Sequence, residues 1–238
     1  SSRGLGDVYK RQAAVPPAPK LPADAYFLMD ATTGQVLVDH NGDLSLPPAS
    51  LTKIMTSYVL AEEVDAGRAS LDDMIKVSRN AWSQNPTFKG SSLMWIEPGK
   101  PVSLADLERG VVISSGNDAS VAVAEHLAGT ESSFVDVMNQ LAAELGLDNT
   151  VYRNPHGLPH PEHRTTARDL ATLSVALING HPEHYKIYKE QSFTYNGIKQ
   201  YNRNSLLRSD ASVDGLKTGY TSEAGCLLYT SPSPRDDR

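Results

Sequence analysis

The chain has a single cysteine, Cys226, and no apolar run near the roughly 18 to 20 residues that a membrane span requires. An internal disulfide is therefore excluded, and the cysteine count says little about the redox compartment. Positive charge is also scarce: 22 lysines and arginines face 28 aspartates and glutamates, for a formal net charge of −6. Because nucleic-acid-binding domains carry a basic face, this balance argues against DNA or RNA as a partner.

The two ends of the sequence are related at the level of DNA. One short oligonucleotide encodes residues 226–236 on one strand and, shifted by one base, residues 2–12 on the other. Its sequence resembles a transposase-end adapter used to prepare sequencing libraries. We therefore predict that residues 1–12 and 226–238 are adapter artefacts, which are set aside in fold reasoning. Residues 13–23 are predicted to be an extended, proline-rich lead-in, and residues 24–225 a folded domain.

Local patterns predict both strands and helices in that domain. Strand signals cover residues 25–30, 35–39, 192–195, 198–201 and 213–220, with Asn196-Gly197 as the turn of a hairpin. Helical signals cover residues 50–66, 118–128 and 132–147, and capping boxes predict helices that start after Ser103 and Thr166. Strands lie towards the ends of the chain and helices fill its middle. This order predicts an α+β fold, with a mainly helical lobe beside an antiparallel sheet.

A first chemical signal is Ser50, which precedes Lys53 by one helical turn. This spacing puts both side chains on one helical face. A serine hydroxyl is a poor nucleophile until a base removes its proton, and a lysine becomes such a base when burial or a nearby cation lowers its pKa. Taken alone, the pair is more typical of a serine helix cap followed by a surface lysine than of a catalytic pair.

Two further triplets follow along the chain. In Ser115-Gly116-Asn117 the hydroxyl can relay a proton, and the amide can hydrogen-bond to a substrate backbone. In Lys217-Thr218-Gly219 the cation and the hydroxyl suit a carboxylate, and the glycine lets an extended peptide pair with the strand edge. Each triplet by itself is also typical of an ordinary loop or strand end.

In this order, the three motifs resemble the motif set of the penicillin-interacting serine enzymes. The surrounding residues are most similar to the D-alanyl-D-alanine carboxypeptidases, the low-molecular-mass penicillin-binding proteins. The similar segments are residues 48–56, 114–118, 154–158, 166–169 and 213–219. The resemblance covers residues 24–225. It implies a β-lactamase/transpeptidase-like fold, a serine acyl-enzyme, and neither metal nor cofactor.

The resemblance also implies a role for each matching residue. Ser50 would attack the penultimate D-Ala carbonyl, Lys53 would be the general base, and Ser115 would carry a proton to the leaving amine. The implied substrate-binding residues are Asn117, Arg203, Lys217, Thr218, Gly219 and Tyr220. The backbone N–H groups of Ser50 and Tyr220 would form the oxyanion hole. The implied partners are peptidoglycan stem peptides and β-lactam antibiotics, in the periplasm.

The family's pattern extends beyond the last residues that match it here. We therefore expect a truncated catalytic domain whose sheet is incomplete on its C-terminal side, with residues 226–231 able to imitate the next strand. The parent protein is expected to lie at the inner membrane through a C-terminal amphipathic helix that this chain lacks. The chain as written is expected to be an unstable, inactive fragment of an active parent, because strand edges are left unpaired.

Other readings of the same motifs stay open. A class A β-lactamase needs a glutamate held by a Glu-x-x-x-Asn loop, and Glu144 and Asn149 have the wrong spacing for it. A penicillin-sensing domain would use the same triplets without turnover, and a D,D-endopeptidase or transpeptidase of the same superfamily would share them all. His156 is expected to be structural. The histidines at 160, 163, 181 and 184 are expected in polar loops, without a metal.

Overall fold

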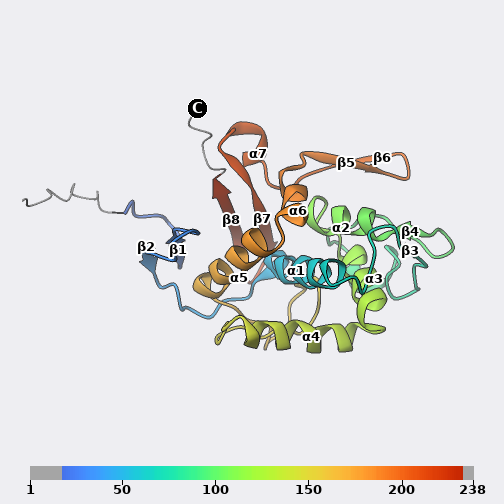
Figure 1. Ribbon diagram of the computed structural model, residues 1–238, viewed down its shortest axis with the longest axis horizontal. Coiled ribbons are helices and arrows are strands. Elements are labelled where there is room, and N and C mark those ends of the chain that lie inside the picture. Colours follow the sequence, from blue (N-terminus) through green and yellow to red (C-terminus); the bar gives the residue numbers. More distant parts are fainter. Residues whose placement is uncertain (1–17, 233–238) are drawn as a thin grey trace, which may run out of the picture.

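The computed structural model describes residues 18–232, and it has strands towards both ends of the chain with most helices between them (Figure 1). The helices are α1 (Thr52–Asp65), α2 (Leu104–Val112), α3 (Asn117–Ala128), α4 (Glu131–Glu144), α5 (Ala167–Gly180), α6 (Pro182–Tyr185) and α7 (Leu206–Ser209). Three short 3-10 turns accompany them: η1 (Ala49–Leu51), η2 (Pro86–Phe88) and η3 (Lys186–Lys189). The prediction of an α+β fold is confirmed.

The described strands form antiparallel pairs rather than one continuous sheet. The pairs are β1 (Tyr26–Met29) with β2 (Val36–His40), β3 (Met74–Ile75) with β4 (Val102–Ser103), β5 (Ser192–Tyr195) with β6 (Ile198–Tyr201), and β7 (Val213–Thr221) with β8 (Gly225–Pro232). The predicted hairpin at Asn196-Gly197 is confirmed, and the strands predicted at residues 25–30 and 35–39 also pair with each other. Tyr220 lies opposite Cys226, so the run after residue 225 does pair as a strand, as the sequence suggested it could.

The predicted helix starts are confirmed, but only half of each capping box is visible. The hydroxyl oxygens of Ser103 and Thr166 each accept a hydrogen bond from the N–H three residues ahead, at 3.1 Å. This satisfies one free donor of the first helical turn. The carboxylate of Asp169 does not return to the cap. It accepts instead from Asn149 N and Thr150 Oγ1, because those donors lie beside it in the folded chain.

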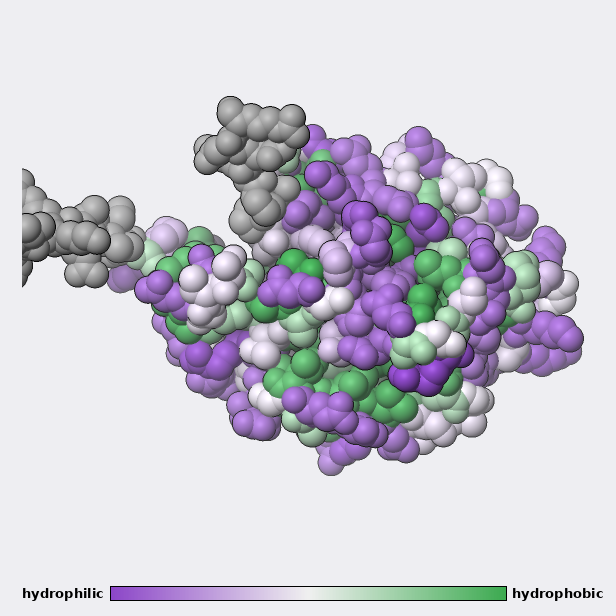
Figure 2. All heavy atoms as spheres, in the orientation of Figure 1, coloured by the Kyte–Doolittle hydropathy of each residue, from purple (hydrophilic) through white to green (hydrophobic). Residues whose placement is uncertain are grey.

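Helix α1 is the centre of the core and lies among α2, α3, α4 and α5 (Figure 1). Ten consecutive residues, 52–61, are buried, and Ile54 and Met55 are fully inaccessible. A helix that is buried all round needs no amphipathic pattern, and this one shows little. Figure 2 shows apolar residues gathered where α4 packs below α1, while most of the face is hydrophilic. The core therefore fixes the first turn of α1, which carries Lys53.

Candidate active site

Ser50 lies in the η1 turn, immediately before α1. Its Oγ accepts a hydrogen bond from Lys53 Nζ at 3.3 Å, which confirms that the two side chains share one face. Ala49 has a φ of +47°, so the backbone bends sharply just before the serine. Such a bend separates the serine from the regular helix and leaves its hydroxyl only partly buried.

Lys53 is buried among neutral acceptors. Its side chain is 1% exposed, and Nζ donates to Asn117 Oδ1 at 2.7 Å and to the carbonyl oxygen of His156 at 2.6 Å. Burial, followed by the positive charge of Lys217, lowers the pKa of Lys53 well below its usual range, although the charge of Asp118 acts in the opposite direction. A lysine in these surroundings becomes neutral readily, and a neutral amine beside a hydroxyl is a general base.

The loop motif joins the two lysines. Asn117 binds Lys53 as described, and Ser115 Oγ accepts from Lys217 Nζ at 3.0 Å. Ser115 has a φ of +60°, which aims its side chain across the site in a conformation that residues other than glycine seldom adopt. The hydroxyl therefore lies next to the strand motif. Its predicted relay between Lys53 and the substrate nitrogen stays a prediction.

The strand motif lies on β7, against the η1 turn that carries Ser50. Lys217 is 2% exposed, and burial together with the nearby charge of Arg203 lowers its pKa to about 7. A Cβ added to Gly219 would come within 3.2 Å of Ser50 N, so a side chain here would crowd η1 and push it a few tenths of an ångström away from β7. The Tyr220 side chain, one residue further along β7, is 68% exposed.

Of the remaining predicted binding residues, Thr218 lies on β7 and Arg203 lies on the loop between β6 and α7. Thr218 is partly buried, and its carbonyl oxygen accepts from Lys217 Nζ at 3.0 Å. Arg203 is exposed between two buried asparagines, one of which, Asn204, donates from Nδ2 to the carbonyl of Gly215 at 3.0 Å. This bond ties the arginine's loop to the start of β7. The fold thus brings all nine predicted site residues to one region, where η1, α1, the 115–117 loop and β7 meet.

A turn at residues 154–157 contributes a group that sequence reasoning missed. Asn154 Oδ1 accepts from the N–H groups of His156 and Gly157, which closes the turn and presents the His156 carbonyl to Lys53. Gly157 has a φ of +88°, and a Cβ there would lie 1.8 Å from the Ala49 carbonyl oxygen. The sequence feature that could have indicated this turn is the Asn-Pro-x-Gly pattern of residues 154–157, which is typical of a turn.

Of the four histidines that were expected in polar loops, three are buried: His163, His181 and His184. His163 Nε2 lies 2.9 Å from Thr52 Oγ1, and burial, aided by neighbouring positive charges, lowers the pKa of His163 to about 3. His181 lies against Asp65 at the end of α1 and His184 against Glu108 in the middle of α2, and these carboxylates compensate for the loss of water. Within residues 18–232, no group of three or more His, Cys, Asp or Glu side chains is arranged to hold a metal ion.

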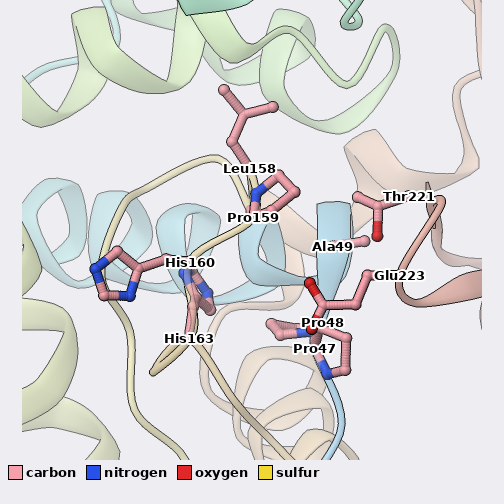
Figure 3. A pocket seen from close by; sticks show the side chains of 10 residues that line it. Pro47, Pro48, Ala49, Leu158, Pro159, His160, His163, Thr221 and Glu223 are labelled. Atoms are coloured by element: carbon pink, nitrogen blue, oxygen red, sulfur yellow. The ribbon is translucent and has the colours of Figure 1, made fainter.

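A small pocket adjoins the site at the far end of β7 (Figure 3). It lies between Pro48 and Ala49 on one side, Leu158 and His163 on another, and Thr221 beyond the strand motif. Its volume is about 10 Å³, which is room for about one water molecule. The pocket is therefore too small to enclose a peptide. Across the described residues, no helix is long and apolar enough to cross a membrane.

Comparisons with known proteins agree with this geometry. Residues 11–237 match the family model described as D-alanyl-D-alanine carboxypeptidase. The chain is 49% identical to the D-alanyl-D-alanine carboxypeptidase DacC of Escherichia coli over 223 residues, which is 93% of this chain and 56% of that protein. The chain therefore spans little more than half of this curated relative.

Solved structures show the same fold. Penicillin-binding protein 5 of Haemophilus influenzae superposes with a TM-score of 0.89 at 44% identity, over 92% of this chain and 63% of that one. Penicillin-binding protein D2 of Listeria monocytogenes, solved with ampicillin bound, gives a TM-score of 0.79 at 30% identity, over 92% of this chain and 87% of that one. The β-lactamase/transpeptidase-like fold that the motifs implied is confirmed.

Proposed function

The chain belongs to the D-alanyl-D-alanine carboxypeptidase family, and we propose that it removes the terminal D-alanine from peptidoglycan stem peptides through an acyl-enzyme on Ser50. The observation that supports this most directly is the position of Lys53. Its amine is buried, lies 3.3 Å from the Ser50 hydroxyl and is surrounded by uncharged acceptors. Such an amine can take the proton of Ser50 at the moment of attack.

The proposed reaction has two stages. In acylation, Lys53 accepts the Ser50 proton, Oγ bonds to the penultimate D-Ala carbonyl carbon, and the C–N bond breaks. The terminal D-Ala leaves as an amine after it receives a proton through Ser115. In deacylation, water adds to the ester, the C–O bond to Ser50 breaks and the shortened peptide leaves. The backbone N–H groups of Ser50 and Tyr220 are proposed to stabilise both tetrahedral states.

Substrate binding is proposed to use the edge of β7. Lys217 and Thr218, with Arg203 beside them, would hold the terminal carboxylate, and Asn117 would hydrogen-bond to the acyl chain. Gly219 leaves space for an extended peptide to pair with the strand. A β-lactam carries a carboxylate and a reactive carbonyl in similar positions, so we propose that penicillins acylate the same serine. Because peptidoglycan lies outside the cytoplasmic membrane, we propose a periplasmic location.

Intact-mass measurement tests the acyl-enzyme directly. The sequence alone predicted an inactive fragment, but the predicted site residues lie together in the described part of the chain, so we now expect the chain to gain the mass of one penicillin, and Ser50→Ala to gain none. Ser209→Ala, which changes an exposed serine at the end of α7, is the matched control and should gain the full mass. Circular dichroism of the three proteins establishes that each is folded. A folded wild-type chain that gains no mass would refute the proposal.

Product analysis separates the related functions. A peptide ending in D-Ala-D-Ala should release one D-alanine for each peptide. Transfer of the acyl group to an added amine, or cleavage of a cross-linked stem peptide, would instead indicate a transpeptidase or an endopeptidase. Stable acylation without release from any peptide would indicate a sensor, and rapid release of hydrolysed penicillin would indicate a β-lactamase.

A further inference from the structure

Asp118 is fully inaccessible to solvent and directly follows the loop motif. Its Oδ1 accepts from Met94 N at 2.8 Å and from its own neighbour Ala119 N at 2.9 Å, while Oδ2 accepts from Trp95 N at 2.8 Å and Ile96 N at 3.2 Å. Four backbone donors for one buried carboxylate exceed what a single helix start requires. Three of the four come from a segment more than twenty residues earlier in the chain.

That segment lies directly against the loop motif. The Asn117 N–H donates to the Ser92 carbonyl at 2.9 Å, and a Cβ added to Gly116 would lie 3.0 Å from Met94 N. Both sides of the contact include a residue in the left-handed region: Ser115 at φ +60° and Trp95 at φ +72°. Neither residue adopts this conformation readily, so surrounding contacts have to impose it. The Asp118 carboxylate accepts from three consecutive N–H groups of the segment around Trp95, whereas Gln200 Nε2 and Ser83 N each donate to a single carbonyl there.

The consequence reaches Lys53 through Asn117. Asn117 is the first residue of α3 and Asp118 the second, so a carboxylate held in place also fixes the amide that accepts from Lys53 Nζ. We propose that Asp118 is a positioning residue for acylation, whose carboxylate locks the 115–117 loop against residues 92–96 and so holds Asn117 against Lys53. This inference rests on the proposed function of Ser50 and adds a residue that the three motifs do not contain.

The charges around Lys53 support a second effect of the same carboxylate. Lys217 on β7 and His156 in the turn after α4 face Lys53, with Arg203 beyond Lys217 and Glu131 paired with His156. Asp118 is the acidic neighbour that opposes these cations at Lys53. Removal of its charge should lower the pKa of Lys53 further. The neutral amine is the base, so the acylation rate falls on the acid side of its pH profile, which we call the acid limb. This acid limb should then move to lower pH.

The decisive variant is Asp118→Asn, which keeps the size of the side chain but replaces one acceptor oxygen by a donor. The rate of Ser50 acylation by penicillin is measured by intact mass against pH. We expect a loss on the order of 10- to 100-fold, as for a misplaced catalytic group, together with a shift of the acid limb to lower pH. Asp136→Asn, at an exposed position on α4, is the matched control and should match the wild type in both respects.

A rescue variant separates positioning from simple instability. Glycine adopts a positive φ at no steric cost, so Trp95→Gly should restore part of the acylation rate when it is added to Asp118→Asn, while the acid limb stays shifted. In Trp95→Gly alone, the acid limb should lie at the same pH as in the wild type. If Asp118→Asn does not fold, the effect of this substitution is measured instead in the Trp95→Gly background, by comparing Trp95→Gly with the double variant.

The outcomes distinguish this inference from the proposed function. A wild-type chain without acylation refutes the function itself. A wild-type chain that is acylated, with an Asp118→Asn variant of equal rate and unmoved acid limb, refutes only the role of Asp118. A lower melting temperature with a uniform loss of rate and no shift of the limb would show a purely structural role, and would also overturn the proposal.

Discussion

Nζ of Lys217 lies 3.0 Å from Oγ of Ser115, so the strand motif and the loop motif are in direct contact across the site. This contact places two buried lysines around one small group of polar atoms, because Asn117 in the same loop binds Lys53. Two cations buried together destabilise each other's charged form. The neutral state of Lys53 therefore depends on the charge of Lys217.

Removal of the Lys217 charge should move the acid limb in the direction opposite to the shift expected for Asp118→Asn. In Lys217→Gln the pKa of Lys53 should rise, since burial remains but the neighbouring cation is gone. Acylation needs the neutral amine, so its acid limb should move to higher pH. The measurement is the rate of penicillin acylation against pH, with the position of the limb as the readout, because loss of carboxylate binding lowers the rate at every pH. An unmoved limb would show that Lys217 does not influence the base.

Arg203 should control the charge of Lys217 in the same manner. Burial and the Arg203 charge lower the pKa of Lys217 to about 7, so binding of a substrate carboxylate should weaken as the pH rises above this value. In Arg203→Gln the pKa of Lys217 should rise, and the increase of KM should begin at higher pH. Arg79→Gln changes another exposed arginine, outside the three motifs, and should behave as wild type. An increase of KM at the same pH in all three proteins would contradict this.

The sequence predicted the parts of the site that follow local rules. The spacing of Ser50 and Lys53 placed them on one face, and Asn196-Gly197 defined a hairpin whose two turn residues both have positive φ. The contacts that depend on the folded chain were not predictable. The burial of His184 depends on Glu108, which is 76 residues away, and no local pattern encodes that contact. The role of Asp118 is similar, because its donors at residues 94–96 come from a stretch without periodicity.

Gly157 should be essential for both folding and acylation. In Gly157→Ala the new methyl group would overlap the Ala49 carbonyl oxygen in a left-handed backbone, and the turn that presents the His156 carbonyl would have to move. We expect the free energy of unfolding to fall by about 2–5 kcal/mol, since overpacking costs about 1–3 kcal/mol and a left-handed backbone about 1–2 kcal/mol more.

Gly180→Ala, at the last residue of α5, is the control for Gly157→Ala. Nothing lies near its added Cβ, so the substitution should stabilise the helix slightly, by about 0.5–1 kcal/mol. Urea unfolding and penicillin acylation are compared for both variants. Equal stability of the two would show that the turn at 154–157 adapts, and that its contact with η1 does not hold the nucleophile.

The buried pair of His184 and Glu108 should make stability depend on pH. Their side chains are 4% and 1% exposed, with Nδ1 and Oε1 2.5 Å apart, and Asp65 and His181 face the same imidazole. Burial lowers the pKa of His184, but the hydrogen bond and charge of Glu108, with Asp65, outweigh it, so the pKa is raised overall.

A raised pKa fixes the sign of the pH dependence. The pair contributes its full stability below the unfolded pKa of about 6.5, and the contribution is lost as the pH rises through the higher folded-state pKa. Urea unfolding between about pH 6 and about pH 9 should therefore show the wild type losing stability more steeply than His184→Gln. His184→Gln should itself cost about 3–5 kcal/mol at the lower pH, because Glu108 is left buried without its partner. His160→Gln, at an exposed histidine, should follow the wild type throughout. Parallel curves for the wild type and His184→Gln would mean that the imidazole is not protonated in the folded chain.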